Sequence, residues 1–308
     1  MNVVRRTKET LDKTITLSNN SIDLPRNGVI ERITLLFDVT LSNAGASAVN
    51  VTMEDILKAI EEIRVNADAN DIKYALKGLD LAIMNYYESR SKAVNLAETI
   101  SVPAGGTASK TFMLYLDAGL IHAVAKESLN ILIRFNTNVA TDVTISDATV
   151  KITLDKLVFA DAEEWYSYFD GVFEEPKVWV KSASFNASTE LEEVLSIPTG
   201  AIAWRGFITV FDSSDARADI IDKYAVKQTK PLNIELLKVD WKTGQEIDKV
   251  EYGLDAVLTG VTVIDYDKEL VSGGLDLRSA EMGVFKLALK PTTGGKVRYI
   301  SHEIVVLE

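Results

Sequence analysis

Alternating strand-like segments that occur in the same order in each half of the chain predict a mostly β protein. It should consist of two tandem antiparallel β-sandwich domains with a few short helices. The first observation is Val29–Leu41, where apolar residues fall mainly at odd positions and polar residues mainly at even positions. This period of two is typical of a strand with one buried and one wetter face. The second observation is that this segment follows Pro25, and that a later strand-like segment ending at Asp212 follows Pro198.

The third observation is that four landmarks recur in the same order and at nearly constant spacing, which indicates a tandem duplication. The pairs are Pro25 and Pro198, Phe37-Asp38 and Phe211-Asp212, Gly78-Leu79-Asp80 and Gly253-Leu254-Asp255, and Phe112 and Phe285. About seven or eight strand-like segments in each half, with few helices, fit an antiparallel sandwich or barrel. Alternating βαβ units are not visible, which argues against a doubly wound fold.

The domain division follows from the same pattern. We expect an amino-terminal arm over residues 1–13, a first domain over 14–170, a linker over 171–176 and a second domain over 177–308. The linker is placed at Glu174-Glu175-Pro176, because acidic residues before a proline favour an exposed turn.

Four helices are expected among the strand-like segments. Thr52, with Asp55 three residues later, fits a capping box that begins a helix. The expected helices are Met53–Arg64, Gly119–Lys126, Asp161–Asp170 and Asp219–Tyr224, and the expected strands include Leu79–Tyr86.

The amino-acid composition limits the classes of protein and of functional site that the chain can represent. The 308 residues are 47% hydrophobic and 25% charged, which indicates a globular protein. The sequence has no cysteine, which excludes disulfides, thiolate metal sites and thiol nucleophiles. The net charge of −12 argues against direct wrapping of nucleic acid. We found no apolar run of membrane-spanning length and expect no signal peptide at the start.

The sequence presents no catalytic, cofactor-binding or metal-binding signature. His122 and His302 are the only two histidines, and we interpret each as a partly buried or surface residue. The glycines of Ala104–Thr111 do not match a phosphate-binding loop, so this segment is predicted to be a hairpin loop. Asp68 and Asp71 lack the rest of an EF-hand, although a structural cation there stays open. Among 45 acidic residues nothing selects a catalytic carboxylate pair.

A family resemblance rests on four features: the strand starts at Leu24-Pro25 and at Ile197-Pro198, the helix after the first long strand, and the short arm. With these features the chain resembles the double jelly-roll major capsid proteins of tailless icosahedral double-stranded DNA viruses. Within them it is most similar to those of archaeal turreted viruses and related integrated proviruses. The resemblance covers nearly the whole chain and is architectural, since no single motif is diagnostic.

The resemblance implies a structural protein of the virion and not an enzyme. It implies a homotrimer whose six jelly rolls make a pseudo-hexagonal tile of an icosahedral capsid, assembled in the host cytoplasm. The partners implied are further copies of the chain, minor capsid and penton proteins, and an inner lipid membrane. No cofactor and no sequence-specific nucleic acid are implied.

The amino-terminal arm is the one site that the sequence proposes. Val3, Val4, Arg5, Arg6 and Lys8 combine a small apolar patch with clustered positive charge. Such segments are attracted to anionic lipid head groups. Because arms in this family commonly point inward, we expect residues 1–13 to face the particle interior and contact lipid or a neighbouring capsomer. The alternative is a disordered terminus without a partner.

Two other functions stay open. A two-domain jelly-roll carbohydrate-active enzyme or carbohydrate-binding protein would need aromatics on a concave sheet, for which Trp179 and Trp204 are candidates. We expect both tryptophans to lie in the core. A surface or adhesin-like β protein is the second alternative.

Overall fold

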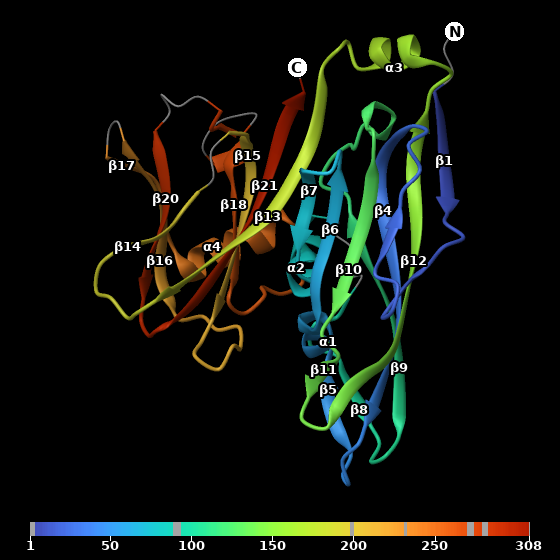
Figure 1. Cartoon of the computed structure of the whole chain (residues 1–308). Helices are drawn as coiled ribbons and strands as arrows, with labels where there is room; N and C mark the ends of the chain where they lie inside the picture. The colour runs from blue at the N-terminus through green and yellow to red at the C-terminus, as the bar shows by residue number, and fades with distance from the viewer. Residues whose placement is uncertain are drawn as a thin grey trace. The chain divides into compact units, whose positions relative to one another are not determined.

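A computed structural model of the chain describes residues 4–88, 94–197, 200–230, 233–269, 274–278 and 283–307 (Figure 1). The chain divides into two compact units, of which the first ends at Pro176 and the second is Lys177–Val306. The strand β13 (Phe173–Phe185) begins ahead of this division and continues past it. The expected exposed turn at Glu174-Glu175-Pro176 is therefore wrong: the segment is strand, and Glu175 and Pro176 are buried.

The first unit has two antiparallel sheets. One sheet has the order β1, β12, β4, β9, with β2 and β11 also paired to β12. The other has the order β3, β10, β6, β7, and β5 pairs with β8 separately. The bounds are β1 Arg5–Thr10, β2 Ile15–Thr16, β3 Ser21–Asp23, β4 Val29–Asn43, β5 Val49–Thr52, β6 Ile60–Ala67, β7 Asp71–Leu76, β8 Thr99–Val102, β9 Thr107–Leu116, β10 Leu129–Phe135, β11 Asn138–Ala140 and β12 Val143–Val158.

The second unit has the same kind of construction. In one sheet β18, β15, β21 and β13 are neighbours in that order, with β19 beside β15, and in the other the order is β14, β20, β16, β17. The bounds are β14 Glu192–Ser196, β15 Ile202–Phe211, β16 Ile221–Lys230, β17 Ile234–Asp240, β18 Val261–Asp265, β19 Leu275–Asp276, β20 Val284–Pro291 and β21 Gly295–Leu307.

The two units share one strand order. Each unit has eight main strands, which in chain order are β1, β3, β4, β6, β7, β9, β10 and β12 in the first and β13, β14, β15, β16, β17, β18, β20 and β21 in the second. In both units one sheet contains the first, eighth, third and sixth of these strands, and the other contains the second, seventh, fourth and fifth. This is the arrangement of an eight-stranded jelly roll. The prediction of two tandem antiparallel jelly-roll domains is confirmed.

The core of the first unit follows from the alternation in β4. Its residues Ile33, Leu35, Phe37, Val39 and Leu41 are all at most 1% exposed, and the residues between them are half-buried. Pairing with β9 places Phe37 opposite Phe112, where the rings stack at 4.9 Å between centroids. Burial of this row stabilises the sandwich, since each large apolar side chain contributes roughly 1.5–3 kcal/mol when removed from water.

Six helical segments connect the strands of the described residues: α1 Met53–Ala59, α2 Gly78–Glu88, the 3-10 helix η1 Ala123–Ala125, α3 Ala162–Tyr168, α4 Trp241–Glu251 and α5 Tyr266–Glu269. The capping box of α1 forms as expected, because the Asp55 amide donates to the Thr52 hydroxyl and the Thr52 amide donates to Asp55. The helix ends at Ala59, however, and the chain continues as β6, so the expected helix Met53–Arg64 is too long. The β-branched residues Ile63 and Val65 pair with β10 instead.

In two other segments, helix and strand are exchanged relative to the prediction. Leu79–Tyr86 belongs to α2 instead of a strand, and a carboxylate oxygen of Asp80 accepts a hydrogen bond from the Lys77 amide at the start of this helix. Asp219–Tyr224 leads into β16 instead of a helix.

The duplication is supported by the strand order and by only part of the landmark pattern. Phe37 lies in β4 and Phe211 in β15, and these strands occupy the same third position. Gly78 begins α2, whereas Gly253 follows the end of α4. Phe112 lies in a sixth strand and Phe285 in a seventh, so these last two pairs are wrong. Pro198 lies outside the described residues.

Candidate functional site

The basic residues singled out in the arm lie on an edge strand. In β1, Arg5 pairs with Val158 and Thr10 with Thr153, so Arg5–Thr10 is an integral strand of the first sheet. The expectation of a free arm over residues 1–13 is wrong for this part. Val4 is half-buried ahead of the strand, and Val3 lies outside the described residues.

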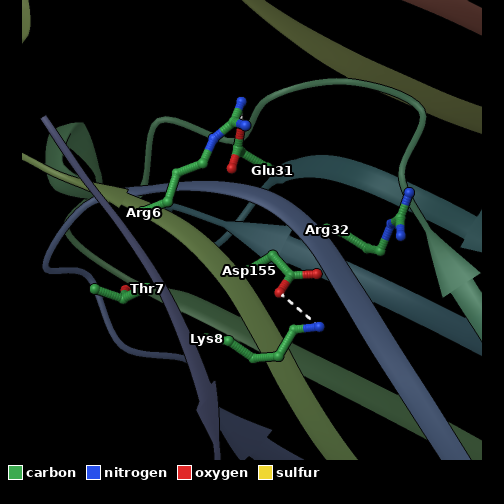
Figure 2. A pocket seen from close by; sticks show the side chains of 6 residues that line it. All are labelled: Arg6, Thr7, Lys8, Glu31, Arg32 and Asp155. Carbon is green, nitrogen blue, oxygen red and sulfur yellow. Dashed lines mark hydrogen bonds and ion pairs between the residues drawn. The ribbon is translucent and has the colours of Figure 1, made fainter.

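A polar groove runs between β1 and its neighbours on the outer face of this sheet (Figure 2). It has a volume of about 410 Å³, and its lining consists of Arg6, Thr7, Lys8, Glu31, Arg32 and Asp155. The structure thus brings Arg6 and Lys8 together, as the sequence suggested, and adds acidic residues from β4 and β12.

Each cation of the groove has a carboxylate partner. Arg6 Nη2 lies 3.0 Å from Glu31 Oε1, and Lys8 Nζ lies 3.3 Å from Asp155 Oδ1 (Figure 2). The side chains of Arg6 and Lys8 remain 78% and 71% exposed, while Glu31 and Asp155 are each 24% exposed. Exposed ion pairs of this kind contribute about 0–1 kcal/mol, so the cations can exchange partners at little cost. Arg5 forms no ion pair within the described part of the chain and is exposed.

A buried charged network lies elsewhere in the first unit. Glu175 is completely buried, and its Oε2 accepts a hydrogen bond from Lys126 Nζ at 2.8 Å and contacts Lys73 Nζ. Both lysine side chains are at most 5% exposed. Burial by itself would lower the pKa of Lys126, but the hydrogen bond and charge of Glu175 outweigh it, so the pKa is raised. This network holds the start of β13 against β7 and the segment before β10.

His122 adjoins this network. Its amide donates to Glu175 Oε1 at 2.9 Å, and its Nδ1 accepts from the Trp165 indole at 3.1 Å. Burial lowers the pKa of His122 to about 4, although the charge of Glu175 opposes the shift, so the ring is neutral at pH 7. His302 is 4% exposed, and the expectation that both histidines are partly buried or at the surface is wrong.

The second unit contains a group of carboxylates beneath α4. Asp248 is 4% exposed and accepts from the Thr262 hydroxyl at 2.8 Å and the Val263 amide at 2.9 Å. Burial raises the pKa of Asp248 to about 7. Burial, together with the charges of Asp248, Glu251 and Asp265, raises the pKa of Glu269 to about 8.

Asp265 is held by a cation and a phenol. It accepts from Arg205 Nε at 3.2 Å and from the Tyr252 hydroxyl at 3.0 Å. The described residues contain no group of three or more metal-ligating side chains. Asp248 in α4 contacts Thr262 and Val263 in β18, so this carboxylate holds α4 on β18.

The other sequence candidates find partners within the protein. Asp68 Oδ1 accepts from the amides of Glu127 and Ser128, and Asp71 contacts Lys73, which occupies the oxygens considered for a cation. Trp179 and Trp204 are half-buried and not core residues.

The Ala104–Thr111 segment contains a turn and then enters β9. The strands on either side pair with β5 and β4 and not with each other, so the expected hairpin is wrong. Across the described ranges, no helix reaches the length and hydropathy that crossing a membrane requires.

The sequence matches no protein-family model and no curated protein. The structure is similar to a crystal structure of the STIV MCP, with a TM-score of 0.87 and 22% identity over 98% of this chain and 97% of that one. It is also similar to a chain in the atomic structure of Sulfolobus Turreted Icosahedral Virus, with a TM-score of 0.84 and 23% identity over 97% and 90% of the two chains.

The chain has the double jelly-roll fold. The same fold extends to the major capsid protein of Bacteriophage PM2, with a TM-score of 0.61 and 15% identity over 99% of this chain and 98% of that one. The fold class predicted from the sequence and its likeness to major capsid proteins are thus confirmed by structures that match almost from end to end.

Local sequence patterns do not reveal the buried network or the carboxylates beneath α4. Lys73, Lys126 and Glu175 are separated by about 50 residues each and share no local pattern. The one local pattern that includes a residue of the network is the acidic pair Glu174-Glu175 before Pro176, and that pattern predicts an exposed turn instead of a buried ion pair.

Proposed function

We propose that this chain is a viral major capsid protein that assembles as trimers and tiles an icosahedral shell. The observation that supports the proposal best is the identical strand order of the two units. Two similar units per chain and a threefold axis give six similar lobes, which matches a hexagonal lattice. The similarity to the STIV MCP over nearly the full length of both chains adds support.

The features of the described residues agree with a role in assembly. The ionisable groups with raised carboxyl pKa are buried beneath a helix and hold secondary structure elements together. The exposed side chains of the β1 groove form mixed ion pairs, which suit a polar contact between subunits. We further propose that the shell encloses a membrane, that minor capsid and penton proteins complete it, and that assembly takes place in the host cytoplasm before the protein enters the virion.

The domain roles follow. We propose that residues 14–170 and 177–308 act as the two lobes and that the amino-terminal end, including Arg5, Arg6 and Lys8, faces the particle interior. The exposed cations of β1 would there contact anionic lipid head groups or a neighbouring capsomer.

Light scattering combined with electron microscopy of the concentrated protein tests the proposal. We expect a mass of three chains and particles of hexagonal outline, with ordered sheets at high concentration. A monomer that persists at high micromolar concentration, in both low and high salt, would contradict the proposed function.

A further inference from the structure

The helices α2 and α4 occupy the same place in the two jelly rolls, because each connects the fifth main strand to the sixth. Every residue of α2 from Gly78 to Asn85 is buried. In α4 the buried residues are only Trp241, Gly244, Gln245 and Asp248. Equivalent positions of the fold therefore carry a covered helix in one unit and a half-covered helix in the other.

The uncovered face of α4 is partly apolar. Val250 is 81% exposed and Ile247 is 41% exposed, and they lie three residues apart on adjacent turns. They line a hollow of about 580 Å³ whose remaining lining is Lys242, Thr243, Glu246 and Glu251. An apolar pair surrounded by charged residues is the composition of a small interface core with a polar rim.

Most of the charges on this face form no ion pair with the residues that the structure describes. Glu251 pairs with Lys268 at 3.2 Å, but Lys242, Glu246 and Lys249 form no ion pair within the described part of the chain. This differs from the β1 groove, where Arg6 and Lys8 are each paired. Unpaired charges around an apolar pair indicate that the partner is another protein surface with matching charges.

The positions of these charges fit a second copy of the same helix. Glu246 and Lys249 are three residues apart, about 4.5 Å along the helix axis, on one side of the exposed face. A twofold axis that passes between them, perpendicular to two antiparallel helices, places Glu246 of each copy opposite Lys249 of the other. The same operation brings Ile247 and Val250 of both copies together. The surface is thus self-complementary in charge and in apolar contact, as an isologous interface requires.

We propose that α4 is a docking surface for a second copy of this chain, in which two α4 helices pack antiparallel about a twofold axis. This inference rests on the proposed function and extends it, since such a contact would join one trimer to the next across a twofold axis of the shell.

The test uses the absence of cysteine from the chain. In Ile247→Cys the new thiol is the only one in the protein, and the proposed axis brings it close to its symmetry mate. Mild oxidation of the concentrated protein should give a disulfide-linked dimer on a non-reducing gel. The matched control is Val124→Cys, whose position in the first unit is 39% exposed and lies outside this surface. Cross-linking of Ile247→Cys no greater than that of the control overturns the inference.

A charge exchange tests the same contact without a covalent bond. Glu246→Lys and Lys249→Glu should each weaken the association between trimers at least tenfold in sedimentation velocity, and the double variant should restore it. Restoration is expected because each exchanged residue again meets its opposite charge in the other copy. Two singly substituted variants that associate like the parent protein would contradict the proposed pairing.

The outcomes separate this inference from the proposed function. Trimers that form normally while α4 cross-links no better than the control leave the proposed function standing and remove the α4 contact. Cross-linked α4 dimers from a protein that never forms trimers support the contact and contradict the trimeric capsid.

Discussion

The carboxylate of Glu175 lies 2.8 Å from the ammonium group of Lys126, and both side chains are withdrawn from solvent. Lys73 contacts the same oxygen of Glu175. One buried anion therefore holds two buried cations, with Asp71 at the edge of the group. Because Glu175 immediately precedes Pro176, where the first unit ends, this contact fixes the chain at the end of the first jelly roll.

Glu175→Gln should destabilise the first unit strongly. The substitution keeps the shape of the side chain but leaves the buried Lys73 and Lys126 with only the half-exposed Asp71 as an anionic partner. Breaking a buried ion pair by removing one partner costs about 3–5 kcal/mol. Urea unfolding at pH 7 measures the loss. The neighbour Glu174 is exposed, so Glu174→Gln is the matched control and should change the unfolding free energy by less than about 0.5 kcal/mol.

Replacing the whole network should cost less than breaking it. In the triple variant Lys73→Met, Lys126→Met and Glu175→Met, no buried charge remains, and the Asp71 side chain that loses its lysine partners is 40% exposed to water. Well-packed apolar replacements of buried ion pairs are often neutral or stabilising. We expect this protein to be more stable than Glu175→Gln in the same urea titration. A triple variant that is less stable would show that the geometry of the network, and not its charge balance, holds the segment.

Asp248 should make the stability of the second unit depend on pH. Its pKa rises from 3.8 to about 7 on folding, so between these values the folded state binds the proton more tightly than the unfolded state. The stabilisation is fully present below about pH 4, is lost as pH rises toward about 7, and does not change further above that. The slope for one proton is at most about 1.4 kcal/mol per pH unit.

Asp248→Asn should flatten this dependence. An asparagine oxygen can still accept from Thr262 and Val263, so the fold is kept while the titrating group is removed. Calorimetric melting temperatures from pH 4 to pH 8 should fall less steeply for this variant than for the parent protein. Glu193→Gln, an exposed carboxylate of β14 in the same unit, is the control and should leave the slope unchanged. If melting temperature depends on pH in the same way for all three proteins, Asp248 is not the group responsible for the pH dependence.

Neutralising β1 should abolish any attraction to anionic lipid. The triple variant Arg5→Gln, Arg6→Gln and Lys8→Gln removes three exposed cations, each worth about 1 kcal/mol near an anionic membrane. Co-sedimentation with anionic liposomes in low and moderate salt measures binding, with neutral liposomes as the reference. Lys151→Gln, an exposed residue of β12, is the control. If the intact protein does not bind anionic liposomes, the lipid role is removed and a role at a neighbouring subunit is left.

Thr52→Ala should destabilise the start of α1 by about 1 kcal/mol. The Thr52 hydroxyl accepts from the Asp55 amide and donates to Asp55 Oδ2 at 2.6 Å, and alanine supplies neither contact. The loss is measured by urea unfolding of the purified protein. Thr52→Ser keeps the hydroxyl and should recover most of the stability, whereas equal losses in both variants would place the effect in the methyl group.

The sequence by itself determined the features that depend on local period and capping. The alternation of Val29–Leu41 specifies a half-buried strand in any context, and Thr52 with Asp55 specifies the beginning of a helix. The recurrence of similar strand starts indicated two similar sandwich or barrel domains, and the resemblance to major capsid proteins implied that they are jelly rolls. The strand alternation and the helix cap each lie within a few neighbouring residues, so they can be recognised without knowledge of what packs against them.

Tertiary structure decided the rest. Leu79–Asn85 is buried on all sides in α2, so its mostly apolar sequence, with Asp80 and Asn85 the polar residues, shows no period that separates helix from strand. Ile60 ends α1 because the residues after it pair with β10, a partner far along the chain. Glu175 looked like a solvent-exposed turn residue because its two lysines lie in distant segments. Free energies that arise from long-range pairing and from burial of charge depend on which segments meet, and only the folded chain fixes that.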